Sequence, residues 1–252
     1  MKQLENKVAV VTGGSRGIGA AIAGALVAAG ARVVISGRTE RTVKETAERL
    51  GALGVVADAS DPESAREPAR QAIEQLGGVD ILVNNVGGVA GGNPDVFRGD
   101  DSAFQDALVL NLTSAFWAIR AAAPSMRERG YGRIINIGSG ASRRASASPG
   151  YTAAKHGIVG LTKQLAQDLA RHGITVNCVC PGWTNTDLVS FPAIAKRSGS
   201  SEDEARASAE AESAQRRILE PGELGPMAVL LASPQGGGIT GQVIGVDGGY
   251  RL

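Results

Sequence analysis

Short runs of β-branched and aliphatic residues recur along the chain and alternate with longer segments rich in alanine and leucine at helical spacing. These runs are continuously apolar, which is typical of strands buried on both faces of a parallel sheet. They lie at residues 8–11, 32–35, 54–57, 81–83, 133–137, 174–179 and 242–246. The alternation predicts a single α/β domain over residues 1–252, doubly wound in the Rossmann manner, with a seven-stranded parallel sheet and helices on both faces.

The charge balance excludes a nucleic-acid binder that is held by electrostatics. The chain has 26 Lys and Arg against 25 Asp and Glu, a net charge of +1. The uncharged stretch at residues 17–31 is shorter than the ~18 to 20 apolar residues that cross a bilayer. Glycine interrupts it, so no membrane span is expected. The first seven residues mix charges of both signs, unlike a signal peptide.

Cysteine and histidine usage argues against metal or disulfide chemistry. Cys178 and Cys180 stand two positions apart in an expected strand, so their side chains share one face, about 7 Å apart along the chain. Such neighbours rarely form a disulfide, and buried core thiols in a cytoplasmic protein are expected. His156 and His172 are the only histidines and are expected to be structural, so no metal site is predicted.

A glycine-rich turn follows the first expected strand directly. It reads Thr12-Gly13-Gly14-Ser15-Arg16-Gly17-Ile18-Gly19, with a helix expected from Ala20. Glycines at such a turn let a pyrophosphate approach the free N–H groups at the helix N-terminus. The spacing is Gly-x3-Gly-x-Gly instead of the general Gly-x-Gly-x2-Gly. Alone, the turn therefore leaves open a purely structural role or a methyl-donor site.

The end of the second expected strand discriminates between the two nicotinamide dinucleotides. A carboxylate about 20 residues past the turn usually binds a ribose 2′-hydroxyl, whereas a 2′-phosphate needs cations. The strand ends in Ile35-Ser36-Gly37-Arg38-Thr39 without an acid, and Arg16 can face Arg38. Guanidinium groups suit phosphate oxygens, so NADP(H) is expected. The alternative is that both arginines are solvated surface charges.

A tyrosine and a lysine are placed to share one helix face. Tyr151 and Lys155 follow Ser148-Pro149-Gly150, which predicts a helix start. A phenol has a pKa of about 10 and is therefore a poor acid or base at neutral pH. A cation one turn away and a helix N-terminus both favour the phenolate, so Tyr151 is expected to transfer protons. An ordinary amphipathic surface pair would have the same spacing.

Taken in order, the motifs identify the chain as similar to the short-chain dehydrogenase/reductase family over essentially its whole length. The motifs are Thr12-Gly13-x3-Gly17-x-Gly19, Asp58, Asn84-Asn85-Val86-Gly87, Asn111, Ser139, Tyr151-x3-Lys155 and Pro181-Gly182. The resemblance implies that Tyr151 gives a proton to a carbonyl, or takes one from an alcohol, while Ser139 holds that oxygen. It also implies that Lys155 binds the nicotinamide ribose and supports Tyr151, and that Asn111 keeps a water in the proton relay.

The resemblance also implies a cofactor site along the carboxyl ends of the strands. Asp58 and Ala59 would contact adenine, residues 85–87 would line the ribose and residues 182–186 would hold the carboxamide. The expected set is Gly13, Ser15, Arg16, Gly17, Ile18, Gly19, Ser36, Arg38, Thr39, Asp58, Ala59, Asn85, Val86, Gly87, Tyr151, Lys155, Pro181, Gly182, Trp183, Thr184 and Thr186.

Two departures from the family pattern affect the site. Val86 stands where alanine is usual, a small steric change at a cofactor wall. Ser139 precedes Tyr151 by 12 residues, one fewer than is most common. Ser142 is therefore a conceivable substitute, but Ser139 directly follows the expected strand and is preferred. The shorter loop is expected to change the mouth of the site.

Among family members, the chain most resembles 3-oxoacyl-(acyl carrier protein) reductases, through residues 132–139 and 240–249. This implies reduction of a 3-oxoacyl thioester or similar ketone. Alternatives are a dehydrogenase of a small hydroxy acid, sugar or steroid alcohol, or a nucleotide-binding regulator without turnover. The positions of carrier-docking arginines hold Gly130 and His172, although Arg129 and Arg171 are adjacent. Arg143 and Arg144 are solvated loop charges or attract an anionic substrate.

Three segments are expected to shape the substrate pocket. Residues 183–217 are polar, with a capping box at Ser201 and Glu204, and predict a substrate lid, called the lid segment below. The others are the loop at residues 88–99, whose glycines suggest mobility, and the loop after Ser139. Residues 103–123 leave little polar face, so a second subunit is expected to cover them. The family resemblance implies a homotetramer.

Overall fold

The computed structural model describes residues 2–89 and 95–252. Seven parallel strands form one sheet in the order β3-β2-β1-β4-β5-β6-β7. The chain order reverses between β1 and β4, which confirms the doubly wound prediction. Each strand lies within two residues of its predicted bounds. The strands are β1 Val8–Thr12, β2 Arg32–Gly37, β3 Leu53–Val56, β4 Ile81–Asn84, β5 Gly132–Ile137, β6 Ile174–Pro181 and β7 Val243–Val246.

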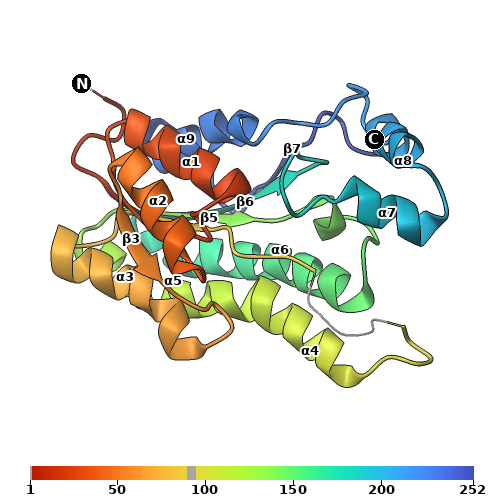
Figure 1. Ribbon diagram of the computed structural model, residues 1–252. Helices are drawn as coiled ribbons and strands as arrows, with labels where there is room; N and C mark the ends of the chain where they lie inside the picture. The colour runs from red at the N-terminus through yellow and green to blue at the C-terminus, as the bar shows by residue number, and fades with distance from the viewer. Residues whose placement is uncertain (1, 90–94) are drawn as a thin grey trace.

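Helices cover both faces of the sheet (Figure 1). Along β1, Ala9 and Val11 pack into the core of one face, while Val8 and Val10 pack into the core of the other. Side chains alternate across a strand, so a strand buried on both faces is apolar at every position. One layer holds α1 Gly17–Ala28, α2 Glu40–Leu50 and α9 Gly225–Ala232, and the other holds α3 Pro62–Leu76, α5 Ser114–Glu128 and α6 Pro149–Leu169.

Helix starts agree with the capping signals in the sequence, with one exception. Ser148 caps α6 by accepting the Tyr151 N–H, and Ser201 and Glu204 form the predicted capping box of α8, Glu202–Ala211. α1 begins at Gly17, three residues earlier than expected, because the glycine turn itself enters the helix. No side chain caps α1, all of whose residues the structure describes, so its first N–H groups remain available.

The expected helix at residues 103–123 is present, within a helical stretch at residues 101–128 that contains a π-helical turn. α4 Asp101–Leu108 is followed by a π-helical turn, Val109–Thr113, before α5 begins. Within the described ranges, residues 101–128 are the one helical stretch whose length and apolar composition would suffice to cross a membrane, a criterion that core helices also meet. Ile119 and Ala122 are buried against the sheet, whereas Phe104 and Phe116 are 40% and 39% exposed.

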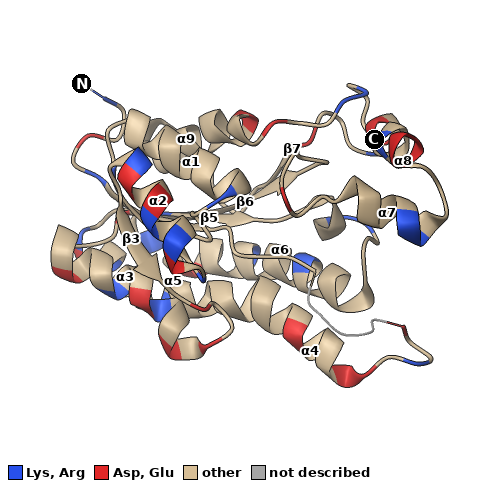
Figure 2. Cartoon of the chain, in the orientation of Figure 1, with Lys and Arg blue, Asp and Glu red and all other residues tan. Residues whose placement is uncertain are grey.

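The lid segment folds as two helices with a small apolar core of their own. α7 Phe191–Ser198 and α8 pack together through Phe191, Ala195, Ala205 and Ala209, apart from the two main cores. In Figure 1 they lie at the end of the molecule where β7 and the last residues of the chain arrive. Acidic and basic residues occur together on α2 and α3 (Figure 2), in keeping with the net charge of +1.

Candidate active site

The predicted catalytic residues come from three elements that meet at the carboxyl ends of β4 and β5. Ser139 follows β5, Tyr151 and Lys155 lie on the first turns of α6, and Asn111 lies in the π-helical turn. Gly87 lies between Asn111 and Lys155. A Cβ atom there would lie 2.9 Å from Asn111 Oδ1 and 3.1 Å from Lys155 Nζ. Only glycine leaves room for this approach of backbone to both side chains.

The Lys155 ammonium group is buried and fixed in position. The side chain is 3% exposed, and Nζ donates a hydrogen bond to the Ile137 carbonyl at 2.9 Å. It lies 5.8 Å from the centroid of the Tyr151 ring. A cation is buried at a large desolvation cost, so a protein keeps one where it is bonded and used. The predicted pairing of this cation with the half-buried Tyr151 is present in the fold.

Asn111 ties the loop after β4 to the π-helical turn. Its Nδ2 donates to the Gly88 carbonyl at 2.9 Å and to the Ala107 carbonyl at 3.0 Å, and its Oδ1 accepts the Gly88 N–H at 3.0 Å. π-helical turns inside helices are frequent at functional sites, because the extra residue redirects a side chain. Part of the predicted substrate loop at 88–99, including Gly91 and Gly92, lies outside the described residues.

The two candidate serines have different environments. Ser142 is 4% exposed, and its hydroxyl accepts the Ser139 N–H at 3.1 Å. Ser139 is half-buried, and its hydroxyl accepts the Ala141 N–H at 3.1 Å, which leaves its own proton to donate. Ser142 thus shapes the turn that holds Ser139. This geometry favours Ser139 as the residue that meets a substrate oxygen.

The glycine turn packs closely against the end of β4. A Cβ on Gly19 would overlap the Gly13 carbonyl oxygen and the Asn85 amide, and Gly13 has a φ of +63°. Asn85 Nδ2 donates to the carbonyls of Thr12 and Gly13 at 3.2 and 3.0 Å. The turn leads into the uncapped N-terminus of α1, whose free N–H groups suit an anion. These residues therefore fit the pyrophosphate of a dinucleotide.

The two arginines predicted to bind a 2′-phosphate face different acids. Arg16 lies 3.8 Å from Asp187 of the lid segment, and both side chains are well exposed. Hydrogen bonds from the Ser60 hydroxyl and backbone lower the pKa of Asp58, and the charge of Arg38 lowers it further. The glycine turn and the end of β2 do meet, because a Cβ on Gly37 would lie 2.5 Å from Ser15 Oγ.

The loop after β6 bridges the sheet edge and the glycine turn. Pro181 ends β6, and a Cβ on Gly182 would lie 2.7 Å from the Asp247 carbonyl oxygen. Thr184 Oγ1 donates to the Gly182 carbonyl at 3.0 Å. A Cβ on Gly17 would lie 3.4 Å from Thr186. The loop predicted to hold the carboxamide thus spans the distance from β6 to α1.

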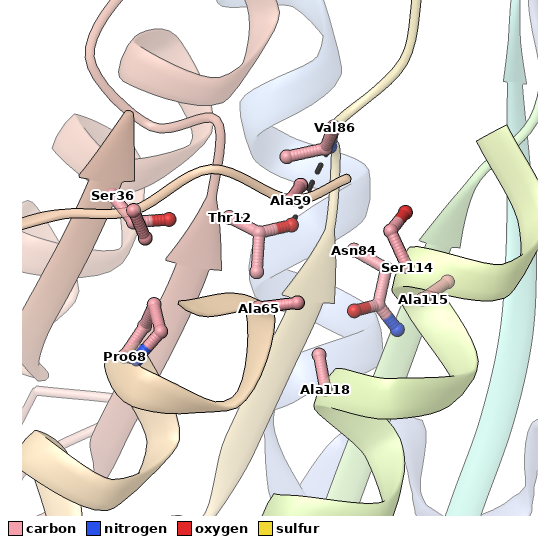
Figure 3. Close-up of a pocket in the computed structure, with 11 residues that line it drawn as sticks. Thr12, Ser36, Ala59, Ala65, Pro68, Asn84, Val86, Ser114, Ala115 and Ala118 are labelled. Atoms are coloured by element: carbon pink, nitrogen blue, oxygen red, sulfur yellow. Dashed lines mark hydrogen bonds between the residues drawn. The ribbon is translucent and has the colours of Figure 1, made fainter. Parts of the chain in front are cut away.

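A small cavity lies under the adenosine side of the predicted cofactor site (Figure 3). It is lined by Thr12, Ser36, Ala57, Ala59, Ala65, Pro68, Asn84, Val86, Ser114, Ala115 and Ala118. Within residues 2–89 and 95–252, Asn84 Oδ1 is one of two buried side-chain oxygens or nitrogens without a hydrogen-bond partner. The cavity wall therefore presents an unmatched acceptor.

A buried chain of hydrogen bonds explains why Asn84 points its oxygen this way. Thr162 Oγ1 donates to the Ile158 carbonyl at 2.7 Å, so it accepts from Asn136 Nδ2 at 2.9 Å. Asn136 Oδ1 then accepts a hydrogen bond from Asn84 Nδ2 at 2.8 Å, so the Asn84 side-chain oxygen is left without a donor. The chain runs from the cavity to α6, the helix that carries Tyr151 and Lys155.

Cys178 and Cys180 share one face of β6, as predicted. Their sulfurs are 3.8 Å apart and both thiols are free and buried. The hydrogen bond with Cys180, followed by burial, raises the pKa of Cys178, so this thiol stays protonated. A Cβ on Gly138 would lie 2.8 Å from each sulfur. The pair supports the backbone immediately before Ser139.

The basic residues near the predicted carrier-docking positions have partners within the chain. Arg129 Nε lies 2.9 Å from Asp80 Oδ1, and Asp80 is 1% exposed. Arg171 Nε donates to His172 Nε2 at 3.2 Å, and the Arg143 guanidinium donates to the Val243 carbonyl. The Arg129 pair lies before β4, at the amino end of the strand and away from the site.

Sequence reasoning missed the residues that attach the lid segment to the site. The Trp183 indole N–H donates to Glu212 Oε2 at 2.8 Å, and the Tyr250 ring packs against Gly140. Trp183 was expected, from the family resemblance, to serve the cofactor. Its partner lies 29 residues further along the chain, and no motif marks it.

Comparisons with known proteins match the chain over nearly its whole length. A family model described as enoyl-(acyl carrier protein) reductase matches residues 13–251. The chain is 36% identical to a 3-oxoacyl-(acyl-carrier-protein) reductase of Vibrio cholerae, covering 99% of both proteins. It is 37% identical to a D-beta-hydroxybutyrate dehydrogenase of Cupriavidus necator, covering 98% of both. The crystal structure of an actinorhodin polyketide ketoreductase with NADPH superposes with a TM-score of 0.91, at 34% identity and 97% coverage of both chains.

These similarities extend over the sheet, the glycine turn and the cluster around Gly87 together, not over one motif alone. The relatives share oxidation or reduction at a CH–OH group as their chemistry, with NAD(P) as the family's cofactor. Over nearly its whole length, the chain belongs to the short-chain dehydrogenase/reductase family of oxidoreductases.

Proposed function

We propose that the protein is an NADPH-dependent reductase that converts a ketone, such as a 3-oxoacyl thioester, to a secondary alcohol. The observation that carries this proposal is the approach of Asn111 and Lys155 to Gly87, beside the start of α6. This arrangement places a buried cation under Tyr151 and beside the backbone of the predicted ribose wall. A protein that only bound a nucleotide would have no use for such a proton-transfer cluster.

The side chains have distinct parts in the proposed reaction. Bound NADPH would supply the hydride. Tyr151 gives its hydroxyl proton to the carbonyl oxygen, and the Ser139 hydroxyl donates a hydrogen bond to the same oxygen. Lys155, held by the Ile137 carbonyl, stabilises the phenolate that remains. Asn111 fixes the loop after β4, and the remaining lone pair of its Oδ1 can accept a hydrogen bond from a water that returns the proton.

The uncapped N-terminus of α1 suits the pyrophosphate of either nicotinamide dinucleotide, and two further features support NADP(H). β2 ends in Ser36-Gly37-Arg38 without the acid that would repel a 2′-phosphate. Arg16 and Arg38 are exposed, and their acidic partners are solvent-accessible surface groups that a phosphate can replace.

The substrate is proposed to be a small molecule, free or thioester-linked, without a fixed carrier partner. Arg129 is bound to the buried Asp80 and is not available for docking. The likeness to a D-beta-hydroxybutyrate dehydrogenase supports a second candidate, oxidation of a small hydroxy acid by the same residues. The reverse reaction needs Tyr151 as the proton acceptor.

Association of subunits is proposed for the α4–α5 face. Phe104 and Phe116 are partly exposed on helices whose other side is buried in the core. A second copy that covered this face would remove apolar surface from water. A homotetramer, as the family resemblance suggests, is the proposed assembly, and the two free thiols favour a cytoplasmic location. A monomeric mass at micromolar concentration would contradict the assembly.

The test of function is the loss of NADPH absorbance with a panel of 3-oxoacyl thioesters and small ketones. Tyr151→Phe is expected to lower kcat by at least about a hundredfold, the usual contribution of a positioned acid. Tyr131→Phe is the matched control, because the Tyr131 hydroxyl donates to the Ala232 carbonyl at the other end of the sheet. Wild-type turnover by Tyr151→Phe would overturn the proposed acid, and equal efficiency with NADH would overturn the cofactor preference.

A further inference from the structure

Three segments that are distant in the sequence meet at one carboxylate. Glu212 follows the last residue of α8, at the end of the lid helices. Its Oε2 accepts the indole N–H of Trp183, in the loop after β6, at 2.8 Å. Its Oε1 accepts a hydrogen bond from the Arg251 guanidinium. Its backbone carbonyl accepts the Arg251 N–H at 2.7 Å. Glu212 therefore joins the end of helix α8, the predicted carboxamide loop and the residues after β7.

Residues 248–251 also pair with the lid segment along the backbone. The Ala214 N–H donates to the Gly249 carbonyl and the Gln215 N–H to the Gly248 carbonyl, both at 3.0 Å. Ser213 and Tyr250 form an antiparallel bridge. Figure 1 shows the end of the chain beside α8. The contact therefore consists of a short antiparallel backbone pairing in addition to the ion pair between Glu212 and Arg251.

Tyr250 extends the same contact to the loop after β5. Its ring packs on Gly140, where a Cβ atom would overlap the ring carbons. Gly140 directly follows Ser139 and lies in the turn that Ser142 shapes. The Arg251 guanidinium carbon lies 5.3 Å from the Tyr250 ring centroid. The position of the Ser139 turn is therefore connected through Tyr250 to Glu212.

The charge on Glu212 is maintained although the group is partly desolvated. Its side chain is 26% exposed. Burial acts to raise the pKa of Glu212, but hydrogen bonds from Arg251 and Trp183 outweigh it and lower the pKa overall. Burial and the nearby Glu212 charge raise the pKa of Tyr250. At neutral pH the cluster thus contains a carboxylate that accepts hydrogen bonds and a neutral phenol.

We propose that Glu212 is a positioning residue for catalysis: it couples the lid helices α7 and α8 to the carboxamide loop at Trp183 and, through Tyr250, to the turn that holds Ser139. The proposal rests on the proposed function, because it gives the lid segment a part in the same reaction. When the lid segment settles over a bound substrate, the Glu212 contacts hold the carboxamide loop and the serine turn in their reacting positions. Without the carboxylate, the lid helices keep their own apolar core but lose this connection.

The test compares carboxylates on the same lid helix or at its end. Glu212→Ala is expected to lower kcat/KM for the ketone about tenfold, the effect of losing charge-assisted hydrogen bonds. The loss should appear in kcat and in the KM of the ketone. The NADPH dissociation constant should change less than kcat/KM does, because the pyrophosphate contacts of the glycine turn remain while only the carboxamide loop is released. Glu210→Gln is the matched control, since the Glu210 side chain pairs only with Arg206 of α8 among the side-chain contacts found in the described residues.

A double-mutant cycle separates coupling from general damage. Arg251→Ala should lower kcat/KM for the ketone about as much as Glu212→Ala does. The double variant should have a kcat/KM no lower than that of either single variant. Arg251→Lys should restore part of the activity. If Glu212→Ala fails to fold, Glu212→Gln carries the same test, because it keeps an oxygen for Trp183 but loses the charge that Arg251 binds. The proposal would be overturned if Glu212→Ala were as active as Glu210→Gln. It would also be overturned if the losses of Glu212→Ala and Arg251→Ala simply added in the double variant.

A spectroscopic measurement distinguishes this proposal from the function on which it rests. In a Trp117→Phe background, the emission of Trp183 reports its contact with Glu212 without any turnover. Glu212→Ala should shift that emission, and NADPH should then quench it to a different extent than in the parent. If the wild-type enzyme reduces no ketone, the proposed function fails whatever the emission does. If it does reduce ketones but the emission and rates of Glu212→Ala match the parent, only the positioning role fails.

Discussion

The glycine turn and the lid segment are held in place by different kinds of contact. Around Gly13 and Gly19, backbone atoms approach so closely that a single Cβ would overlap a neighbour, and the contacts join segments at the ends of adjacent strands. Around Glu212, contacts are polar, partly exposed, and join residues 29 and 39 positions apart in the chain. The turn packs on a main core, whereas α7 and α8 have a small separate one.

This difference separates two kinds of task. A dinucleotide needs a fixed surface, and steric contact at a buried sheet edge supplies it. A substrate has to enter and leave, so the segment above it is held by contacts that can break without unfolding the core. Substitutions in the turn are therefore expected to weaken cofactor binding strongly, and those around the lid segment to change rates.

The largest effect is expected at Gly19. Gly19→Ala places a Cβ against the Gly13 carbonyl oxygen and the Asn85 amide, and relief of this overlap displaces the turn. Overpacking of this kind costs up to about 3 kcal/mol, or about a hundredfold in NADPH affinity. Titration of NADPH fluorescence measures the change. Gly160→Ala is the control, since a Cβ there meets nothing within 4 Å, and unchanged affinity in Gly19→Ala would remove the steric argument.

A smaller effect is expected beneath the site, in the buried chain of amides. Asn136→Leu leaves the Asn84 amide without its acceptor, which costs about 1 to 3 kcal/mol of unfolding free energy. Urea denaturation at constant slope measures it. Thr175→Val in the neighbouring strand is the contrast, because the Thr175 hydroxyl is buried without a partner and its removal should cost nothing. Equal stabilities of the two variants would show that the amide chain contributes nothing.

The smallest effect is expected where the lid segment rejoins the core. The Arg217 guanidinium, followed by the Glu220 N–H, lowers the pKa of Glu223 from its ordinary 4.5 to about 2. A carboxyl group whose pKa is lowered in the folded protein stabilises the fold fully at pH values above its ordinary pKa of 4.5. This contribution is lost as the pH falls from 4.5 toward 2. The stability difference between wild type and Glu223→Gln should shrink over that window, and salt should weaken it. A difference that is independent of pH would contradict the ion pair.

Much of the fold could be predicted because its signals are local. The seven apolar runs, the caps at Ser148 and Ser201 and the shared face of the two cysteines each depend on residues within one turn or strand. The π-helical turn at Asn111 was missed because one extra residue in a helix leaves the apolar pattern nearly unchanged. The ion pair of Arg16 with Asp187 could not be predicted, because the two residues are 171 positions apart in the chain.

The sequence by itself determined the layered sheet, the family and the identities of the candidate catalytic side chains. Periodicity and short motifs encode these features in neighbouring residues. Only the tertiary structure decided which residues surround Gly87, which arginines are already paired and where Glu212 finds its partners. Those contacts depend on the distances between elements that are far apart in the chain, and packing around two cores sets these distances.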